Sequence, residues 1–138
     1  KGSLRMKIVL AAGCFDGFHV GHMIHLKNAS DMGDTLVVAL TDDNTVRKEK
    51  GWFRPIFNED QRYDFLMGLR YVDSVVIVSS TREALERVNP HILAKGPDYC
   101  MAKIDDDTMK YCVENGITIK FTDGPKFSST ALLSQIFK

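Results

Sequence analysis

The sequence predicts an α/β domain with a parallel sheet of about five strands and helices on both faces of that sheet. Short apolar runs alternate along the chain with segments of helical periodicity, which is the order that forms strand–helix–strand units. The chain has 138 residues, of which 44% are hydrophobic, and such a chain normally builds one hydrophobic core. We therefore expect a single domain that binds its ligands at the carboxyl ends of the strands.

The N-terminal part predicts a strand, a helix and a second strand. Residues 7–12 are apolar after Lys7, as in a strand that is buried on both faces. Residues 23–32 carry apolar residues near helical spacing, and Gly33 is a typical residue at the end of a helix. Residues 35–40 form the next apolar run, so the chain begins with a strand–helix–strand unit.

The middle of the chain continues this alternation. Asn58 is a typical helix-capping residue, and two acidic residues follow it in the first turn of the expected helix. Residues 73–78 predict a third strand, residues 81–88 a short helix, and residues 92–94 a brief fourth strand. The order again favours parallel strands joined by helices.

The C-terminal part adds another helix, a strand and a final helix. Residues 105–115 suit a helix that is closed by Gly116, and residues 117–121 suit a strand. Residues 128–137 predict a last helix, because hydroxyl residues at its start can cap it.

The domain is expected to cover residues 7–138. Residues 1–5 precede Met6, which is a plausible natural start, and they are expected to be either an added remnant or disordered.

Composition narrows the class of protein. The 18 basic and 18 acidic residues cancel, so no overall field attracts nucleic acid. Apolar segments are too short to cross a bilayer, and no signal-peptide pattern is present. The three cysteines, Cys14, Cys100 and Cys112, have no paired short spacing, which favours free thiols in a reducing compartment. We expect a cytoplasmic protein without a nucleic-acid or membrane partner.

Residues 13–22, with the sequence GCFDGFHVGH, lie where the first strand gives way to the first helix. Glycines let the backbone approach a ligand, and free N–H groups at a helix start favour an anion. His19 and His22 are expected to project from one side of the first helical turn, where they can donate to phosphate oxygens. Two structural histidines are the plainer alternative. A zinc site that includes His25 is another, but carboxylate or thiolate ligands usually complete such a site.

Three further polar clusters follow predicted strands. Lys48 and Lys50 lie in the loop expected after the second strand, Lys95 and Gly96 follow the fourth strand, and residues 128–130 follow the last. Each cluster has a plainer interpretation, namely a solvated loop, an ordinary turn and a helix cap. Because the carboxyl ends of parallel strands meet at one edge of the sheet, the clusters are expected to converge on one anion site.

Together these motifs resemble the HxGH signature of the nucleotidyltransferase superfamily, in its cytidylyltransferase-like branch, and the resemblance covers nearly the whole chain. The strings GCFD, VRKEKG followed by RPI, and KGPDY are most similar to the adenylyltransferase domain of ADP-heptose synthesis. Glycerol-3-phosphate cytidylyltransferase is the next most similar pattern, but the arginine before its hydroxyl motif aligns near Thr122 and is absent. The resemblance implies a Rossmann-like enzyme of carbohydrate biosynthesis that commonly forms a homodimer.

The resemblance also implies roles for individual residues. His19, His22 and Lys50 are expected to be catalytic, with Mg²⁺ as a cofactor that bridges triphosphate oxygens and no protein metal site. Arg62 is expected to contact substrate phosphate, and its plainer alternative is a pair with Glu59 along the helix. The residues expected to contact the nucleotide are Cys14, Phe15, Asp16, Gly21, Lys48, Lys95, Gly96, Ser128, Ser129 and Thr130.

The expected reaction joins a nucleoside monophosphate from a nucleoside triphosphate to a sugar or polyol phosphate and releases pyrophosphate. The resemblance implies ATP with heptose 1-phosphate first, and CTP with glycerol 3-phosphate as the alternative. A nucleotide-binding regulatory module without turnover is the alternative from another class. The role of Asp16 stays open between holding its loop and holding the metal.

Overall fold

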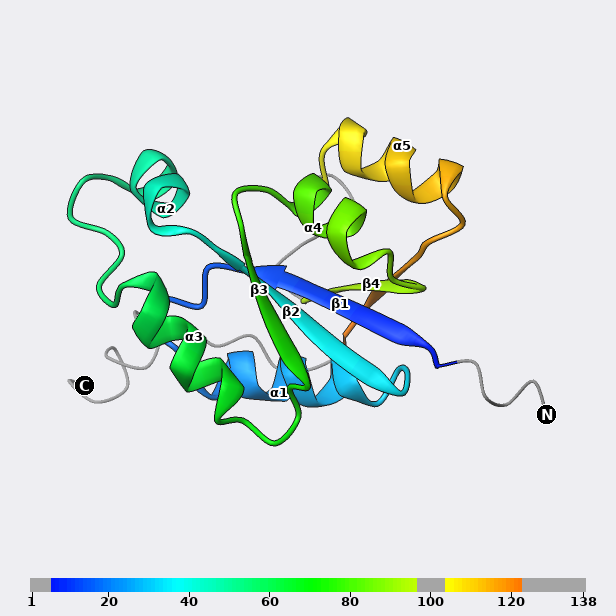
Figure 1. Ribbon diagram of the computed structural model, residues 1–138, viewed down its shortest axis with the longest axis horizontal. Coiled ribbons are helices and arrows are strands. Elements are labelled where there is room, and N and C mark those ends of the chain that lie inside the picture. Colours follow the sequence, from blue (N-terminus) through cyan, green and yellow to red (C-terminus); the bar gives the residue numbers. More distant parts are fainter. Residues whose placement is uncertain (1–5, 97–103, 123–138) are drawn as a thin grey trace, which may run out of the picture.

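A computed structural model describes residues 6–96 and 104–122 and contains one parallel sheet (Figure 1). The order of the strands across the sheet is β3-β2-β1-β4-β5, and all four pairings are parallel. The strands are β1 (Ile8–Gly13), β2 (Thr35–Thr41), β3 (Ser74–Val78), β4 (Ile92–Lys95) and β5 (Thr118–Phe121). The predicted fold class is confirmed.

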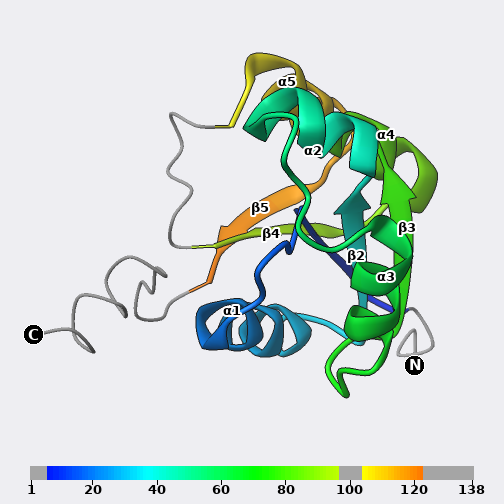
Figure 2. The same cartoon turned by 90° about the vertical axis from the view of Figure 1, so that its left-hand side faces the viewer.

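Helices cover both faces of this sheet. Helices α1 and α3 lie on one face and α4 and α5 on the other, while α2 lies near the carboxyl ends of the strands (Figures 1 and 2). The helices are α1 (Val20–Ser30), α2 (Asp43–Lys50), α3 (Glu59–Met67), α4 (Thr81–Val88) and α5 (Asp106–Glu114). In the part of the chain that the structure describes, none of these helices is long and apolar enough to span a membrane.

The sheet separates two layers of core. Successive side chains of a strand point to opposite faces, so Val9 and Ala11 of β1 pack in the layer beneath α1 and α3. Leu10 packs in the layer beneath α4 and α5. All three are completely buried, as expected for a central strand that is covered on both sides.

The strand order places a crevice at the carboxyl end of β1. The chain runs from β1 through β2 to β3 on one side and then returns to β4 on the other side of β1. Helices on the two sides therefore diverge above β1, and parallel sheets bind ligands at such a point.

Two sequence predictions change in the structure, and a third is not tested by it. Helix α1 begins at Val20 instead of residue 23, because the side chain of His19 caps it. The predicted loop that carries Lys48 and Lys50 is helix α2, because Asp42 accepts a hydrogen bond from the Thr45 N–H and caps its start. The predicted last helix, residues 128–137, lies outside the described residues.

Candidate active site

A cavity of about 250 Å³ opens at the carboxyl ends of the strands. It brings together Cys14 after β1, Lys50 at the end of α2 and Lys95 at the end of β4, three of the residues that the sequence singles out. The other lining residues are Ala12, Gly13, Ala39, Thr41, Glu49, Val78, Ser79, Ser80, Thr81, Ile104, Asp105 and Thr108.

The cavity attracts anions for two physical reasons. Two lysines line it, and the first residues of α4 and α5 lie at its wall, where unpaired N–H groups and the helix dipole give a partial positive charge. Ser80 and Asp105 cap these two helices. The hydroxyl group of Thr81 lies on the same wall, as does that of Ser79, which donates its proton to Asp42 at 2.6 Å.

Lys95 is the more buried of the two lysines, with 8% of its surface exposed. Burial lowers the pKa of Lys95, and the nearby carboxylate of Asp105 and the thiol of Cys112 partly oppose that shift. A desolvated ammonium of this kind gains more from an incoming anion than a hydrated one does. The site therefore favours a charged group such as phosphate.

His19 and His22 lie together at the start of α1, on the loop that leaves the cavity at Cys14. The Nδ1 atom of His19 accepts a hydrogen bond of 3.0 Å from the Gly21 N–H, and the Nδ1 atom of His22 accepts one of 3.0 Å from the His19 N–H. These two bonds form a capping box in which imidazoles take the usual places of hydroxyl and carboxamide groups. The two ring centroids are 4.0 Å apart.

The capping box also fixes which nitrogen of each ring carries a proton. An Nδ1 atom that accepts from a backbone N–H has no proton of its own, so each neutral ring of His19 and His22 carries its proton on Nε2. Phe15 and Phe18 pack against the His22 ring, with centroids 5.7 and 5.2 Å away, and hold its orientation. The result is a pair of oriented Nε2–H donors.

The zinc alternative is not supported by the position of His25. Its Nδ1 atom lies 2.8 Å from Thr122 Oγ1, so His25 links α1 to the end of β5 instead of joining the other two histidines. Over residues 6–96 and 104–122, no group of three histidine, cysteine or acidic residues could hold a metal ion.

Asp16 lies in the loop between β1 and α1 and binds the chain that follows α2. Its side chain is fully buried, and its two oxygens accept hydrogen bonds from Arg54 Nε at 2.8 Å, Ile56 N at 2.7 Å and Phe57 N at 3.0 Å. Burial alone raises the pKa of Asp16, but these hydrogen bonds and the Arg54 charge outweigh burial and lower it. The carboxylate thus holds its loop, which is one of the two roles that the sequence left open.

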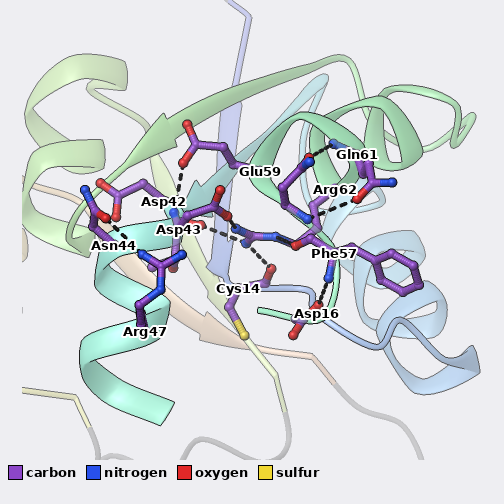
Figure 3. A network of polar contacts seen from close by, with 12 residues as sticks. Cys14, Asp16, Asp42, Asp43, Asn44, Arg47, Phe57, Glu59, Gln61 and Arg62 are labelled. Atoms are coloured by element: carbon purple, nitrogen blue, oxygen red, sulfur yellow. Dashed lines mark hydrogen bonds and ion pairs between the residues drawn. The ribbon is translucent and has the colours of Figure 1, made fainter. Parts of the chain in front are cut away.

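Arg62 is buried at the centre of a network of polar contacts (Figure 3). Its Nη1 atom donates to the carbonyls of Cys14 and Thr41, both at 2.8 Å, and Nη2 forms a 2.6 Å ion pair with Asp43. Its Nε atom donates to the Phe57 carbonyl at 2.8 Å. Every nitrogen of the guanidinium therefore has a protein acceptor, which supports a positioning role for Arg62. Arg62 also lines a second cavity of about 410 Å³, and its contact with substrate phosphate stays a prediction.

The plainer alternative for Arg62, a pair with Glu59 along the helix, is not what the structure shows, because Arg62 pairs with Asp43. Glu59 Oε1 instead accepts from the backbone N–H of Asp43 at 2.8 Å. Glu59 and Arg62 of α3 thus bind the first residue of α2, while Asp42 bonds to Ser79 Oγ at 2.6 Å. Helix α2 is fixed at its start, and its other end carries Lys50 to the cavity.

The remaining predicted residues that the structure describes do not line the cavity. Phe15 is buried in the core, and the Gly21 N–H donates to the His19 side chain that caps α1. Lys48 is exposed on α2 but does not line the cavity. Gly96 packs beside His25, whose ring would lie 3.6 Å from a Cβ at that position. Residues 128–130 lie outside the described residues.

The sequence interpretation missed the wall formed by Ser79, Ser80, Thr81 and Asp105. These residues follow β3 or begin α5, so the rule that pointed to Lys50 and Lys95 could also have found the first three. Short polar runs before helices usually serve only as caps, so these residues carry no separate signal in the sequence.

The sequence of this chain is similar to a family model and to proteins of known name. Residues 10–133 match the family model described as cytidylyltransferase-like. The chain is 38% identical over 130 residues to the bifunctional protein HldE of Aliarcobacter butzleri (strain RM4018), covering 93% of this chain and 27% of that protein. It is 37% identical over 133 residues to the HldE protein of Shewanella baltica (strain OS185), covering 94% and 28%. The chain thus spans about a quarter of the length of these relatives.

Solved structures with a similar fold are also found. The lipopolysaccharide core biosynthesis protein of Thermoplasma volcanium GSS1 superposes with a TM-score of 0.72 at 30% identity, covering 90% of this chain and 100% of that one. A putative nicotinate-nucleotide adenylyltransferase from Vibrio parahaemolyticus, with a TM-score of 0.55 and 15% identity, shares the fold. This chain belongs to the cytidylyltransferase-like family.

Proposed function

We propose that this chain is an adenylyltransferase that joins the AMP group of ATP to a sugar phosphate, with heptose 1-phosphate as the first candidate. The observation that carries the proposal is the pair of oriented Nε2–H donors on His19 and His22, next along the loop from a cavity that holds two lysines. The resemblance to the ADP-heptose branch and the HldE relatives supports the choice of substrate class.

In the proposed reaction, an oxygen of the sugar phosphate attacks the α-phosphorus of ATP. The bond from that phosphorus to the bridging oxygen of the β-phosphate breaks, and pyrophosphate leaves with the electron pair. The acceptor oxygen is already ionised, so no general base is needed. His19, His22 and Lys50 stabilise the negative charge that develops on the phosphoryl oxygens.

Magnesium fits the proposal as part of the nucleotide. Among the described residues no cluster of side chains forms a metal site, and the Asp16 carboxylate holds its loop. Bound Mg²⁺ would neutralise triphosphate charge and orient the leaving pyrophosphate, with the triphosphate oxygens as its main ligands.

The test is pyrophosphate release in the presence of Mg²⁺, with ATP, CTP, GTP and UTP each combined with heptose 1-phosphate and glycerol 3-phosphate. We expect turnover with ATP and heptose 1-phosphate, and a loss of about 100-fold or more in kcat for His22→Ala with little change in ATP binding. Turnover with CTP and glycerol 3-phosphate instead would replace the proposed substrates. Nucleotide binding without turnover in any combination would replace the enzyme with a regulatory module.

A further inference from the structure

We propose that His25 is a positioning residue for the transfer reaction, because it fixes the end of β4, and with it Lys95, relative to His19 and His22. This inference rests on the proposed function and adds a residue to it. His25 lies on α1, one helical turn after His22. It is not among the described residues that line the cavity, so it acts through a residue that is.

The contact of His25 lies where β4 and β5 end. Its Nδ1 atom is 2.8 Å from the Oγ1 atom of Thr122, which directly follows β5 and is buried. The same Oγ1 atom donates to the Lys95 carbonyl at 3.3 Å, and the Thr122 N–H donates to that carbonyl at 2.8 Å. A short polar chain thus runs from the His25 ring through the Thr122 hydroxyl to the backbone of Lys95.

The His25 ring also packs against the chain that leaves β4. A Cβ atom at Gly96 would lie 3.6 Å from Nδ1 of the ring, which is ordinary contact distance. Figure 2 shows β4 and β5 ending side by side above α1. His25 therefore touches both segments at one place, Gly96 after β4 by packing and Thr122 after β5 by a hydrogen bond.

The ladder between β1 and β4 ends just before Lys95. The last pair of that ladder is Ala94 with Ala11. Lys95 is one residue further along and pairs with Phe121 of β5. The link from α1 through Thr122 thus holds Lys95 at the point where its strand is no longer paired with β1.

The place of Lys95 matters because the proposed reaction uses groups on both sides of this link. His19 and His22 lie at the start of α1, Lys95 lines the cavity, and all three are expected to contact phosphate oxygens of one nucleotide. A misplacement of about 1 Å can cost roughly 100-fold in the rate of such a transfer. The bond between His25 and Thr122 keeps the spacing between the two histidines and Lys95.

The same contact predicts the tautomer of His25. The Thr122 hydroxyl has one proton, which it donates to the Lys95 carbonyl. Its oxygen must then accept from Nδ1–H of His25. A neutral His25 ring therefore carries its proton on Nδ1.

The three other histidines of the chain have the opposite tautomer. His19, His22 and His91 each accept a backbone N–H on Nδ1, so their neutral rings carry the proton on Nε2. We expect nitrogen-15 NMR spectra of the neutral imidazoles to show one Nδ1–H ring among the four histidines. The variant His25→Asn should lose that signal. Four Nε2–H rings would break the chain to the Lys95 carbonyl and overturn the proposal.

Kinetics test the positioning role. Thr122→Val replaces the hydroxyl by a methyl group, and His25→Leu removes the ring donor. Each should lower kcat about tenfold and change KM for ATP by about twofold or less, because the charge of Lys95 stays in the cavity. Since both variants break one link, the double variant should be no slower than either single variant.

Three further variants are the controls. Thr122→Ser keeps the hydroxyl and His25→Asn keeps an N–H donor near the place of Nδ1, so both should recover most of kcat. Thr118→Val makes the same change as Thr122→Val at the exposed start of β5 and should change neither kcat nor KM. Circular dichroism shows whether each variant is folded; where His25→Leu is not, Thr122→Val and Thr122→Ser carry the test.

The outcomes separate this inference from the proposed function. A lower urea midpoint with wild-type kcat in Thr122→Val and His25→Leu would mean a merely structural contact and overturn the inference, with the reaction left standing. A raised KM for ATP with unchanged kcat would overturn it in favour of nucleotide binding. Losses that multiply in the double variant would overturn the shared link. Absence of wild-type turnover with any substrate would overturn the proposed function, whereas the NMR spectra would still test the contact of His25 with Thr122.

Discussion

Replacement of Asp16 by asparagine tests how the site is held together. The buried carboxylate accepts three hydrogen bonds, from Arg54 Nε and from the N–H groups of Ile56 and Phe57. Hydrogen bonds to an ionised group contribute about 1.5–3 kcal/mol each. Asparagine keeps one acceptor oxygen, turns an NH₂ group toward the remaining donors and removes the charge opposite Arg54. We expect the free energy of unfolding to fall by about 3 kcal/mol.

Urea unfolding followed by far-ultraviolet circular dichroism measures this change, as a lower midpoint with an unchanged slope. The matched control is Asp31→Asn, which removes an exposed pair with Lys27 at 3.8 Å and should leave the midpoint unchanged. An Asp16→Asn variant as stable as the wild type, but with lower activity that excess Mg²⁺ restores, would refute the structural role and favour a metal ligand.

The pH dependence of the free energy of unfolding is a second test of the structural role of Asp16. The pKa of Asp16 is lower in the folded protein than its ordinary value of 3.8, so its stabilising effect is fully present above that value. It is lost as the pH falls through the lowered folded pKa. Wild-type stability should therefore fall more steeply than that of Asp16→Asn below a pH of about 4.

Three further variants test other parts of the site. Arg62→Lys keeps the charge but cannot reach four acceptors, so thermal or urea unfolding should show a loss of about 2–4 kcal/mol; a loss of activity with unchanged stability would contradict the positioning role. His19→Asn can still cap α1, whereas His19→Ala cannot. Both should lose activity, but only alanine should lose about 1 kcal/mol of stability, and equal stabilities would contradict the capping role. Lys95→Met should weaken ATP binding by tenfold or more, measured by calorimetry, because it removes a buried charge near the anion site. Burial lowers the folded pKa of Lys95 below 10.5, so wild-type stability should rise as the pH increases through that window, and Lys95→Met should lack this rise.

The sequence predicts the sheet and most of the helices because their signals are local. The apolar runs at residues 7–12 and 35–40 become β1 and β2, and Asn58 caps α3 as expected. Periodicity and capping residues carry this information within a few positions of each element. Helix α2 was missed because its residues are mainly polar and only Val46 is buried, which gives no apolar stripe to detect.

Some features of the site can be predicted from the sequence and others cannot. The histidine pair is predicted from its local motif, residues 13–22. The convergence of Lys50 with Lys95 is predicted because both follow parallel strands, whose carboxyl ends meet at one edge of the sheet. The partners of Asp16 and Arg62 could not be predicted, because they lie 38 to 41 and up to 48 residues away along the chain. His91 shows the same limit, since its Nδ1 atom accepts from the N–H of Ile8 at 3.0 Å and nothing near it in the sequence indicates that contact.

The most direct test of the account is the identity of the product formed from ATP and heptose 1-phosphate. We predict one pyrophosphate for each sugar phosphate consumed, and a product whose two phosphorus nuclei show the coupled resonances of a diphosphate between adenosine and the sugar. Release of AMP without a sugar adduct, or no consumption of ATP by a protein that binds it, would contradict the claim that this chain joins a nucleotide to a sugar phosphate.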